Sequence, residues 1–412
     1  MLSHSLSGLG RAWCLGIWLL GIPQVARAAD PAPPVPLSPA DAVHAALLIH
    51  PLVRQADARL QAAHGARSQA GSLRQNPQLS GSLSVDGSRA GAALSQPISA
   101  TGEGLRARVA TQGAVDAADS AQQRAHLVAA SQVRTAYIAA VVATGRVRVA
   151  SAGVELAERL LHAVTRQHEE GEASTLSLRL ARLAEVQAAT RLMDARQSEV
   201  TALRQLAAMV GRPVGAGDLS ADPLAAVPKP LSIGGPERSD VVAARSALGA
   251  ASAELDRQRA ATMPPVGVGV FVEREDQQTF VGPSLSVTVP VFNRNQSGRA
   301  TAQGNEKVAK ARLRSIDAQA TTERLTASQR LAEAEALVSS LAADPEQEAT
   351  AALTSIEAGY LAGELDLPTT ILLQNDVLDG QNAALVLRGQ LGLARLDNML
   401  AIEDPALLAA RR

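Results

Sequence analysis

Histidine and carboxylate side chains that could carry catalysis or bind a metal ion are sparse and poorly spaced. The six histidines after residue 28 are never closer than six residues, so no two share a helix face at the i, i+4 spacing of a metal site. They are His44, His50, His64, His126, His162 and His168. The patterns G-x-x-x-x-G-K, G-x-S-x-G and H-E-x-x-H are absent from the sequence. We therefore predict no enzymatic activity, no cofactor and no dedicated metal site.

One charged group has two interpretations. His168 is followed by Glu169, Glu170 and Glu172, and these side chains could hold a metal ion loosely. The alternative is a charged, solvated turn without a ligand. The single cysteine, Cys14, can form neither an internal disulfide nor a thiolate cluster.

The composition favours helices and excludes a nucleic-acid partner. Apolar residues make up 46% of the 412 residues, but aromatic residues make up only 2%. Alanine and leucine must therefore supply most of the buried surface, which favours long helices packed closely together. The formal net charge of −1 provides no basic surface for nucleic acid or anionic lipid.

The N-terminus predicts export. Arg11 precedes the apolar run Trp13–Ile22, and Ala26-Arg27-Ala28 supplies an A-x-A site. Residues 1–28 are thus predicted to be a secretory signal peptide, cleaved between Ala28 and Ala29. The alternative is an uncleaved interfacial anchor, since the run is too short to span a bilayer. A Pro-rich segment, residues 29–37, follows, and the exported chain contains no cysteine.

An internal duplication organises the remaining chain. Ser95-Gln96-Pro97-Ile98 corresponds to Thr288-Val289-Pro290-Val291, and Gly171 corresponds to Gly363. The corresponding landmarks lie about 190 residues apart, which indicates two copies of one unit. We assign residues 38–211 and 237–402 to the two repeats, 212–236 to a linker and 403–412 to a C-terminal tail.

Alternating short segments predict two β-hairpins, over about 78–99 and about 265–292. Apolar residues alternate with small or polar ones, as in Val266, Val268, Val270 and Val272. The hairpins could be half-buried on a soluble helical protein or could form a membrane barrel wall. Four strands cannot close a barrel; two chains would supply eight and three would supply twelve, with room for a lumen. Only Phe271, Phe280 and Phe292 lie near these strands, too few for aromatic girdles.

Long helices should fill the rest of each repeat. No proline occurs from Leu105 to Gln167, and some sixty helical residues would reach about 90 Å. Ile371, Leu378 and Leu385 recur at the seven-residue spacing of a coiled-coil seam. Each repeat is thus predicted to contain an antiparallel helical hairpin with Gly171 or Gly363 at its tip. An ordinary up-down bundle shares this periodicity but leaves the signal, the strands and the duplication unexplained.

These residues resemble a known family. The motifs are Ser95–Ile98, Gly171–Ser174, Val289–Gln296 and Tyr360–Glu364. In their order and duplicated spacing they are similar to TolC-type outer-membrane factors, and Phe292-Asn293-Arg294-Asn295-Gln296 is most similar to the cobalt–zinc–cadmium resistance branch.

The resemblance implies a fold, a location and partners. The fold is mainly α with a small β part, in which three chains share a twelve-stranded outer-membrane barrel and a long periplasmic α-barrel tunnel. The implied partners are two further copies of the chain, a periplasmic membrane-fusion adaptor, an inner-membrane RND-type pump and outer-membrane lipid. The implied function is passive export, with divalent heavy-metal cations as the expected cargo.

Two sets of site residues follow from the resemblance. The helix tips are implied to contact the adaptor through Gly171, Glu172, Ala173, Ser174, Gly363, Glu364 and Leu365. Family members often carry gate acids in the last helix, where this sequence has Thr369 and Leu372. Asp376 and Asp379 lie seven residues further on, and in three copies they would form stacked anionic rings; the alternative is two solvated aspartates on the outer surface.

Other functions stay open at this stage. A duct of the same family could carry drugs, other organic compounds or a type I secretion substrate. A periplasmic adaptor or a soluble coiled-coil scaffold would also contain helical hairpins. An adaptor should have one such hairpin and many more strands, whereas this sequence predicts two helical hairpins and four strands.

Overall fold

A computed structural model describes residues 37–71, 76–84, 89–98, 101–230, 237–263, 266–276, 278–287, 291–341 and 344–408. These residues belong to one compact unit, Pro36–Arg412. The predicted signal peptide, its cleavage position at Ala28 and Ala29, and nearly all of the Pro-rich segment lie outside the described residues.

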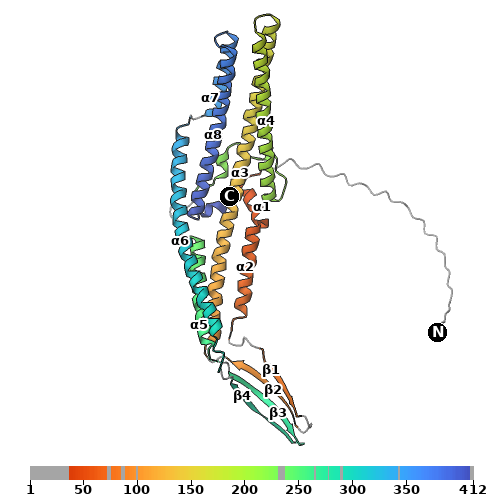
Figure 1. The fold of residues 1–412 in the computed structure, drawn as a ribbon, viewed down its shortest axis with the longest axis vertical. Coiled ribbons are helices and arrows are strands. Elements are labelled where there is room, and N and C mark those ends of the chain that lie inside the picture. The colour runs from red at the N-terminus through yellow and green to blue at the C-terminus, as the bar shows by residue number, and fades with distance from the viewer. Residues whose placement is uncertain are drawn as a thin grey trace, which may run out of the picture. The chain divides into compact units, whose positions relative to one another are not determined.

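The order of elements confirms the duplicated unit (Figure 1). The first repeat contains α1 (Pro39–Ile49), α2 (Pro51–Ser68), β1 (Gln78–Leu83), β2 (Arg89–Ile98), α3 (Glu103–Glu169) and α4 (Thr175–Val210). The second contains α5 (Ser239–Ala260), β3 (Val266–Glu275), β4 (Gln278–Val287), α6 (Gln296–Ser339), α7 (Pro345–Leu361) and α8 (Leu367–Ala401). Three short 3₁₀ helices, η1 (Ala216–Asp218), η2 (Pro223–Ala226) and η3 (Pro405–Leu408), complete the described elements.

The two repeats differ in how their long helix is built. In the first repeat α3 runs unbroken for 67 residues, as the absence of proline predicts. In the second repeat the corresponding length is divided between α6 and α7. Pro345 begins α7 because a proline interrupts helical hydrogen bonding, and the side chain of Asp344 caps the new helix by accepting from the Gln347 amide.

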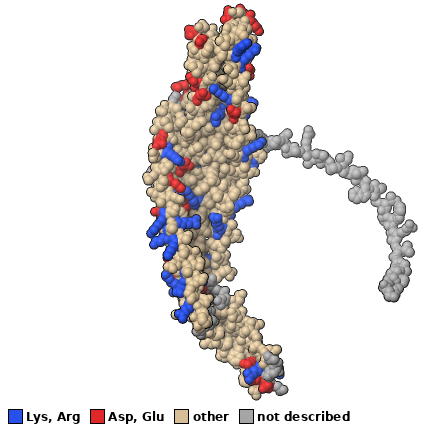
Figure 2. Space-filling model, viewed as in Figure 1, with Lys and Arg blue, Asp and Glu red and all other residues tan. Residues whose placement is uncertain are grey.

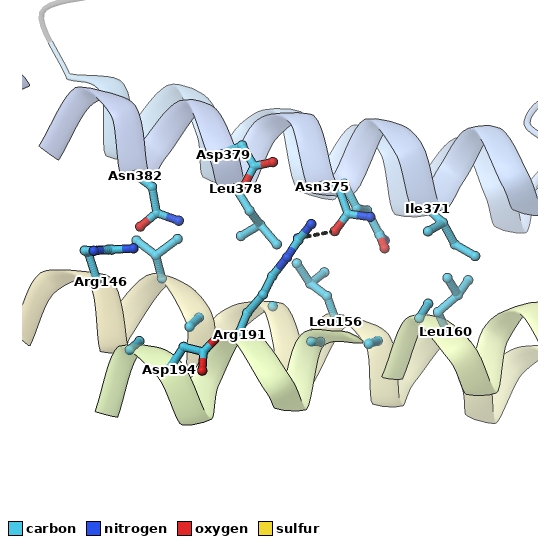
Figure 3. Close-up of a pocket in the computed structure, with 18 of the residues that line it drawn as sticks. Arg146, Leu156, Leu160, Arg191, Asp194, Ile371, Asn375, Leu378, Asp379 and Asn382 are labelled. Atoms are coloured by element: carbon cyan, nitrogen blue, oxygen red, sulfur yellow. Dashed lines mark hydrogen bonds between the residues drawn. The ribbon is translucent and has the colours of Figure 1, made fainter. Parts of the chain in front are cut away.

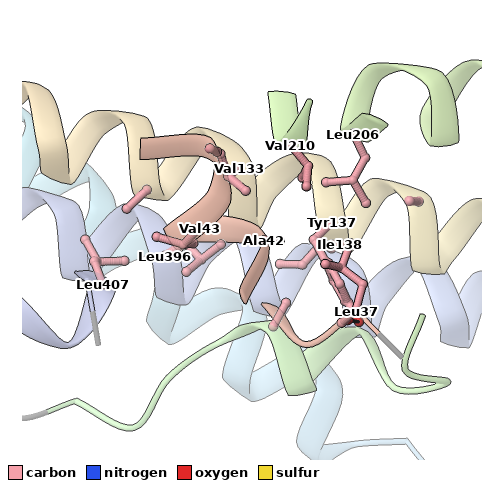
Figure 4. Packing of buried hydrophobic residues seen from close by; sticks show 14 of the residues in the cluster. Leu37, Ala42, Val43, Val133, Tyr137, Ile138, Leu206, Val210, Leu396 and Leu407 are labelled. Atoms are coloured by element: carbon pink, nitrogen blue, oxygen red, sulfur yellow. Dashed lines mark hydrogen bonds between the residues drawn. The ribbon is translucent and has the colours of Figure 1, made fainter. Parts of the chain in front are cut away.

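The core lies where α1, α3, α4 and α8 meet, and it is built largely from small aliphatic residues (Figure 4). Ala42, Ala130 and Ala140 are completely buried there. A Cβ added at Gly389 of α8 would lie 2.7 Å from Val142 of α3, so this glycine permits a close helix crossing. Part of α3 is apolar enough to span a membrane, but 67% of that stretch is buried against its neighbours, as in a core helix.

The linker and the C-terminal segment are packed onto this core. The Tyr137 hydroxyl donates to the Leu37 carbonyl and accepts from the Ser220 amide, both at 3.0 Å, which fixes the linker against α3. Arg134, which is 3% exposed, donates to the carbonyls of Ala226 and Leu407. Residues 403–408, expected to form part of a tail, therefore lie in the core because Leu407 fills an apolar site there.

A buried ionic network joins the start of the second repeat to this region. Arg238 is 2% exposed and pairs with Asp240 at 2.6 Å and with Glu323 at 2.7 Å. Burial raises the pKa of Asp240, but the hydrogen bonds and charge of Arg238 outweigh it and hold this pKa below its ordinary value. Glu403 accepts from the Ser239 amide at 2.8 Å. The network positions α5, and with it the second hairpin, against α6 and the chain end.

The four strands form one antiparallel sheet in the order β1-β2-β3-β4. The pair β2–β3 joins the two repeats, with Arg89 opposite Glu275 and Ile98 opposite Val266. Among the described residues, β1 and β4 are each paired on one side only, so both lateral edges of the sheet lack a strand partner. β4 is described as far as Val287, residues 288–290 of the expected hairpin lie outside the described residues, and Phe292 is 92% exposed.

Candidate functional site: the sheet faces and the helix tips

One face of the sheet is apolar and exposed, and is called here the apolar face. The strand register places large aliphatic residues from all four strands on it. They are Leu79, Leu83, Leu94, Ile98, Val268, Val270, Val272, Val281, Leu285 and Val287. Their exposure ranges from 41% for Ile98 to 78% for Leu79, so the described chain does not cover this face.

The opposite side, called here the small-residue face, has a different composition. Most of its residues are Ser80, Ser82, Gly91, Ala93, Ser95, Gly267, Gly269, Gly282, Ser284 and Ser286. Phe271 and Phe280 also lie on this side, so neither anchors the apolar face. On the sheet surface seen in Figure 2, charged side chains lie near the hairpin turns. Arg89 and Glu275 form an ion pair at this end of the sheet.

The first helix tip is a tight reversal between α3 and α4. Gly171 has φ +81°, a left-handed conformation that side-chain-bearing residues adopt only with strain. The amides of Glu172 and Ala173 both donate to the Gln167 carbonyl, which satisfies the end of α3. Ser174 then caps α4 by accepting from the Ser177 amide at 3.1 Å.

The second tip repeats this geometry between α7 and α8. Gly363 has φ +77°, and the amides of Glu364 and Leu365 both donate to the Gly359 carbonyl. Asp366 caps α8 by accepting from the Thr369 amide at 3.0 Å. The hydrogen bonds from the Thr369 side chain and amide hold the pKa of Asp366 below its ordinary value.

Acidic residues surround both tips, and no metal site assembles there. Glu169, Glu170, Glu172 and Glu364 are exposed, and Figure 2 shows acidic side chains gathered at the tips. Among the described residues, no three His, Cys, Asp or Glu side chains come together to hold a metal ion. The Nδ1 atom of His168 instead lies 2.8 Å from the Ala173 carbonyl oxygen, within the turn.

The two helical hairpins are joined near their tips. An apolar cluster combines Leu160 and Val164 of α3 with Ala181 of α4 and Leu367 of α8. The Tyr360 hydroxyl donates to the Gln167 side-chain oxygen at 2.8 Å.

Further from the tips, polar links continue between the hairpins. Arg191 of α4 donates to the side-chain oxygen of Asn375 in α8 at 2.6 Å (Figure 3). Arg159 of α3 and Glu357 of α7 lie 3.3 Å apart. These contacts cross from the first repeat to the second, which sequence reasoning missed because nothing in the sequence pairs residues so far apart.

Asp376 and Asp379 lie on one exposed stripe of α8. Thr369 and Leu372 belong to the same stripe, so all four side chains share one exposed surface of α8. Asp379 also borders a groove between α3, α4 and α8, together with Arg146 (Figure 3).

One family model matches the first repeat of the chain. Residues 42–212 match the sequence model of the outer membrane efflux protein family. These residues form an outer membrane efflux protein domain. The match covers α1 to α4 with the first hairpin, and the resemblance read from the sequence motifs is thereby confirmed.

A relative with an assigned role supports the same family. The chain is 29% identical over 241 residues to the nickel-cobalt-cadmium resistance protein NccC of Alcaligenes xylosoxydans xylosoxydans. The match covers 57% of this chain and 54% of NccC, so the chain spans about half the length of that relative.

Solved outer-membrane proteins share the fold. The VceC protein of Vibrio cholerae superposes with a TM-score of 0.66 at 19% identity, covering 88% of this chain and 95% of VceC. The outer-membrane channel OprN superposes with a TM-score of 0.70 at 18% identity, covering 90% of this chain and 91% of OprN. The predicted mainly α fold with a four-stranded sheet is therefore confirmed.

Proposed function

We propose that the chain is the outer-membrane channel subunit of a tripartite, RND-type efflux system and acts as a passive trimeric duct. The observation that carries the proposal is the sheet, which has an exposed apolar face and two unpaired edges. Apolar residues facing outward and small polar residues facing inward are the pattern of a membrane barrel wall.

The unpaired edges require further copies of the chain. An edge in hydrocarbon would leave backbone N–H and C=O groups without partners, at a cost of several kcal/mol for each group. Pairing β4 of one subunit with β1 of the next satisfies both edges. Two copies would give eight strands and a filled interior, whereas three give twelve strands and a lumen.

The helical hairpins would continue the duct into the periplasm. α4 carries a stripe of exposed apolar side chains at largely heptad spacing: Leu176, Leu183, Val186, Met193 and Val200. Such a stripe is typical of a helix that packs against another helix. In a trimer the neighbouring subunit supplies that helix, and the hairpins close into a tunnel.

The helix tips are the proposed adaptor contact. Gly171, Glu172, Ala173 and Ser174 form one exposed reversal, and Gly363, Glu364 and Leu365 form the second with the same hydrogen-bond pattern. The adaptor would deliver cargo from an inner-membrane pump. Asp376 and Asp379 would line the inner end of the tunnel as anionic rings that attract cations.

Divalent heavy-metal cations are the proposed cargo, on the strength of the metal-resistance role in the name of NccC. The Asn293–Gln296 segment has a structural role in the described chain and gives no evidence about the cargo. Asn295 has φ 58° and donates to the Gln258 carbonyl at 2.8 Å, so it fixes the start of α6. Drugs, other organic compounds or a type I secretion substrate remain the second candidate cargo.

Membrane fractionation with sizing of the detergent-solubilised protein tests the proposal. We expect the chain in the outer membrane as a trimer, and a deletion strain should be sensitised to divalent metals. Sensitivity to drugs or detergents alone would favour the second cargo. Recovery of the protein in the soluble periplasm would contradict the duct and favour an adaptor or scaffold.

A further inference from the structure

The small-residue face of the sheet carries two aromatic rings that the proposed duct does not require. Phe271 of β3 lies between Ala93 of β2 and Gly282 of β4. A Cβ added at Gly282 would lie 3.0 Å from Cε1 of Phe271, so this ring extends over the glycine. Phe280 is 49% exposed and lies opposite Glu273.

The two rings lie at neighbouring levels of the same hairpin. Phe271 pairs with Gly282, and Phe280 lies two residues nearer the turn on the adjacent strand. A diagonal pair of this kind is about 7–8 Å apart between Cα atoms, within reach of aromatic side chains. The turns of both hairpins lie at the end of the sheet away from α3 and α6, so both rings occupy the half of the sheet remote from the helices.

The rest of this face towards the helices carries much smaller side chains than the two rings. Between the rings and the helix end, this face carries Ser95, Gly267, Gly269, Ser284 and Ser286. A Cβ at Gly269 would lie 2.1 Å from the Leu94 carbonyl oxygen, so the sheet admits no larger residue there without moving its backbone. A barrel lined by such residues is wide, and it narrows where large side chains begin.

One carboxylate accompanies the rings. Glu275 is paired with Arg89, whereas Glu273 has no ion-pair partner among the described residues. Directly opposite residues of an antiparallel pair have Cβ atoms about 4.5–5.5 Å apart, so Glu273 and Phe280 lie side by side. In a trimer, three such carboxylates would lie at the level of the Phe280 rings.

We propose that Phe271, Phe280 and Glu273 form a size- and charge-selective constriction near the outer mouth of the barrel, which passes small hydrated cations and restricts bulky or anionic solutes. The inference rests on the proposed function, because the constriction exists only in a closed barrel. It also favours metal cations over large organic compounds as cargo, since rings of carboxylates attract cations.

Thiol labelling of intact cells tests the sidedness and the constriction together. The exported chain is predicted to lack cysteine, so Ser284→Cys introduces a unique thiol on the small-residue face, deeper than both rings. Leu285→Cys is the matched control on the apolar face. The probes are a small cationic maleimide, a small anionic maleimide and a bulky polyethylene-glycol maleimide, with the protein purified after labelling.

We expect Ser284→Cys to react with the small cationic reagent several-fold faster than with the anionic one, and only slowly with the bulky one. Glu273→Gln should remove the preference for the cationic over the anionic maleimide. Phe271→Ala with Phe280→Ala should raise the rate of labelling by the bulky maleimide several-fold. Val270→Ala with Val281→Ala, at adjacent positions of the apolar face, should change neither rate. Leu285→Cys should stay unreactive, because it faces lipid.

The outcomes separate this inference from the proposed function. Fast reaction of Ser284→Cys with the bulky maleimide in the otherwise unchanged chain would overturn the constriction. Labelling of Leu285→Cys instead of Ser284→Cys would also overturn it. Either result would still be compatible with a protein of the outer membrane. Labelling of both thiols only after the outer membrane is permeabilised would overturn the duct itself, and the constriction with it.

Discussion

Removing two hydrogen bonds near the helix tips should open the inner end of the proposed duct. The change is Tyr360→Phe combined with Arg191→Ala, which deletes the contacts to Gln167 and Asn375 that join the first repeat to the second. Neither change removes an apolar core residue or a tip glycine. The folded hairpins should therefore persist and should separate from one another more readily.

The magnitude follows from the two contacts. The Tyr360 bond is between neutral groups and contributes about 1 kcal/mol. Arg191 makes a charged hydrogen bond, but its exposed position lowers the contribution to about 1 kcal/mol as well. The sum of about 2 kcal/mol in each subunit corresponds to about a thirty-fold rise in that subunit's ratio of separated to joined hairpins, at 1.4 kcal/mol for each factor of ten.

Single-channel recording in planar bilayers detects the resulting rise in the ratio of open to closed channels. Ser355→Ala is the control, because the Ser355 hydroxyl bonds only to the Ala351 carbonyl within α7 and joins no two helices. The control should leave the ratio unchanged. An unchanged ratio in trimers of the double variant, or an equal rise in the control, would refute the view that these contacts hold the hairpins together.

Three further predictions concern the tips and the acidic stripe. Gly171→Ala and Gly363→Ala should each cost about 1–2 kcal/mol, because alanine is strained at positive φ, and should weaken adaptor binding in pull-downs without dissociating the trimer. Asp376→Asn with Asp379→Asn should reduce cation over anion permeability in reversal-potential measurements, whereas solvated outer aspartates would leave it unchanged. The pKa of Asp366 is lower in the folded tip than its ordinary value of about 3.9, so the ionised carboxylate stabilises the folded tip at any pH above that ordinary value. This stabilisation is lost as the pH falls through the lower pKa of the folded state. Hydrogen exchange in the first turn of α8 should therefore accelerate in acid, and Asp366→Asn should abolish that dependence.

Local signals in the sequence were sufficient to predict the helices and their tips. The proline-free stretch placed α3 within two residues of its observed ends, Glu103 and Glu169. The duplicated glycines at 171 and 363 marked both reversals, because a positive φ is a strictly local requirement. The alternation of Val266 to Val272 likewise predicted one apolar side of β3, and the exposed apolar face bears this out.

Contacts between distant segments could not be predicted in the same way. The pairing of β2 with β3 depends on a register that no local pattern specifies. The link between Arg191 and Asn375 depends on how two hairpins pack. Leu407 is completely buried although it belongs to a segment assigned to a C-terminal tail, because η3 folds back onto α3 and α8.

The unequal lengths of the edge strands would affect how the proposed trimer forms. β1 has six residues and β4 has ten, whereas β2 and β3 pair over ten positions, so a β4–β1 seam between subunits has fewer ladder positions than the centre of each sheet. The helices pack within one chain, but the seams of the proposed barrel would exist only when three chains meet. Barrel closure should therefore depend steeply on subunit concentration, and a chain produced in short supply should accumulate as folded helices whose strands have not yet entered the bilayer.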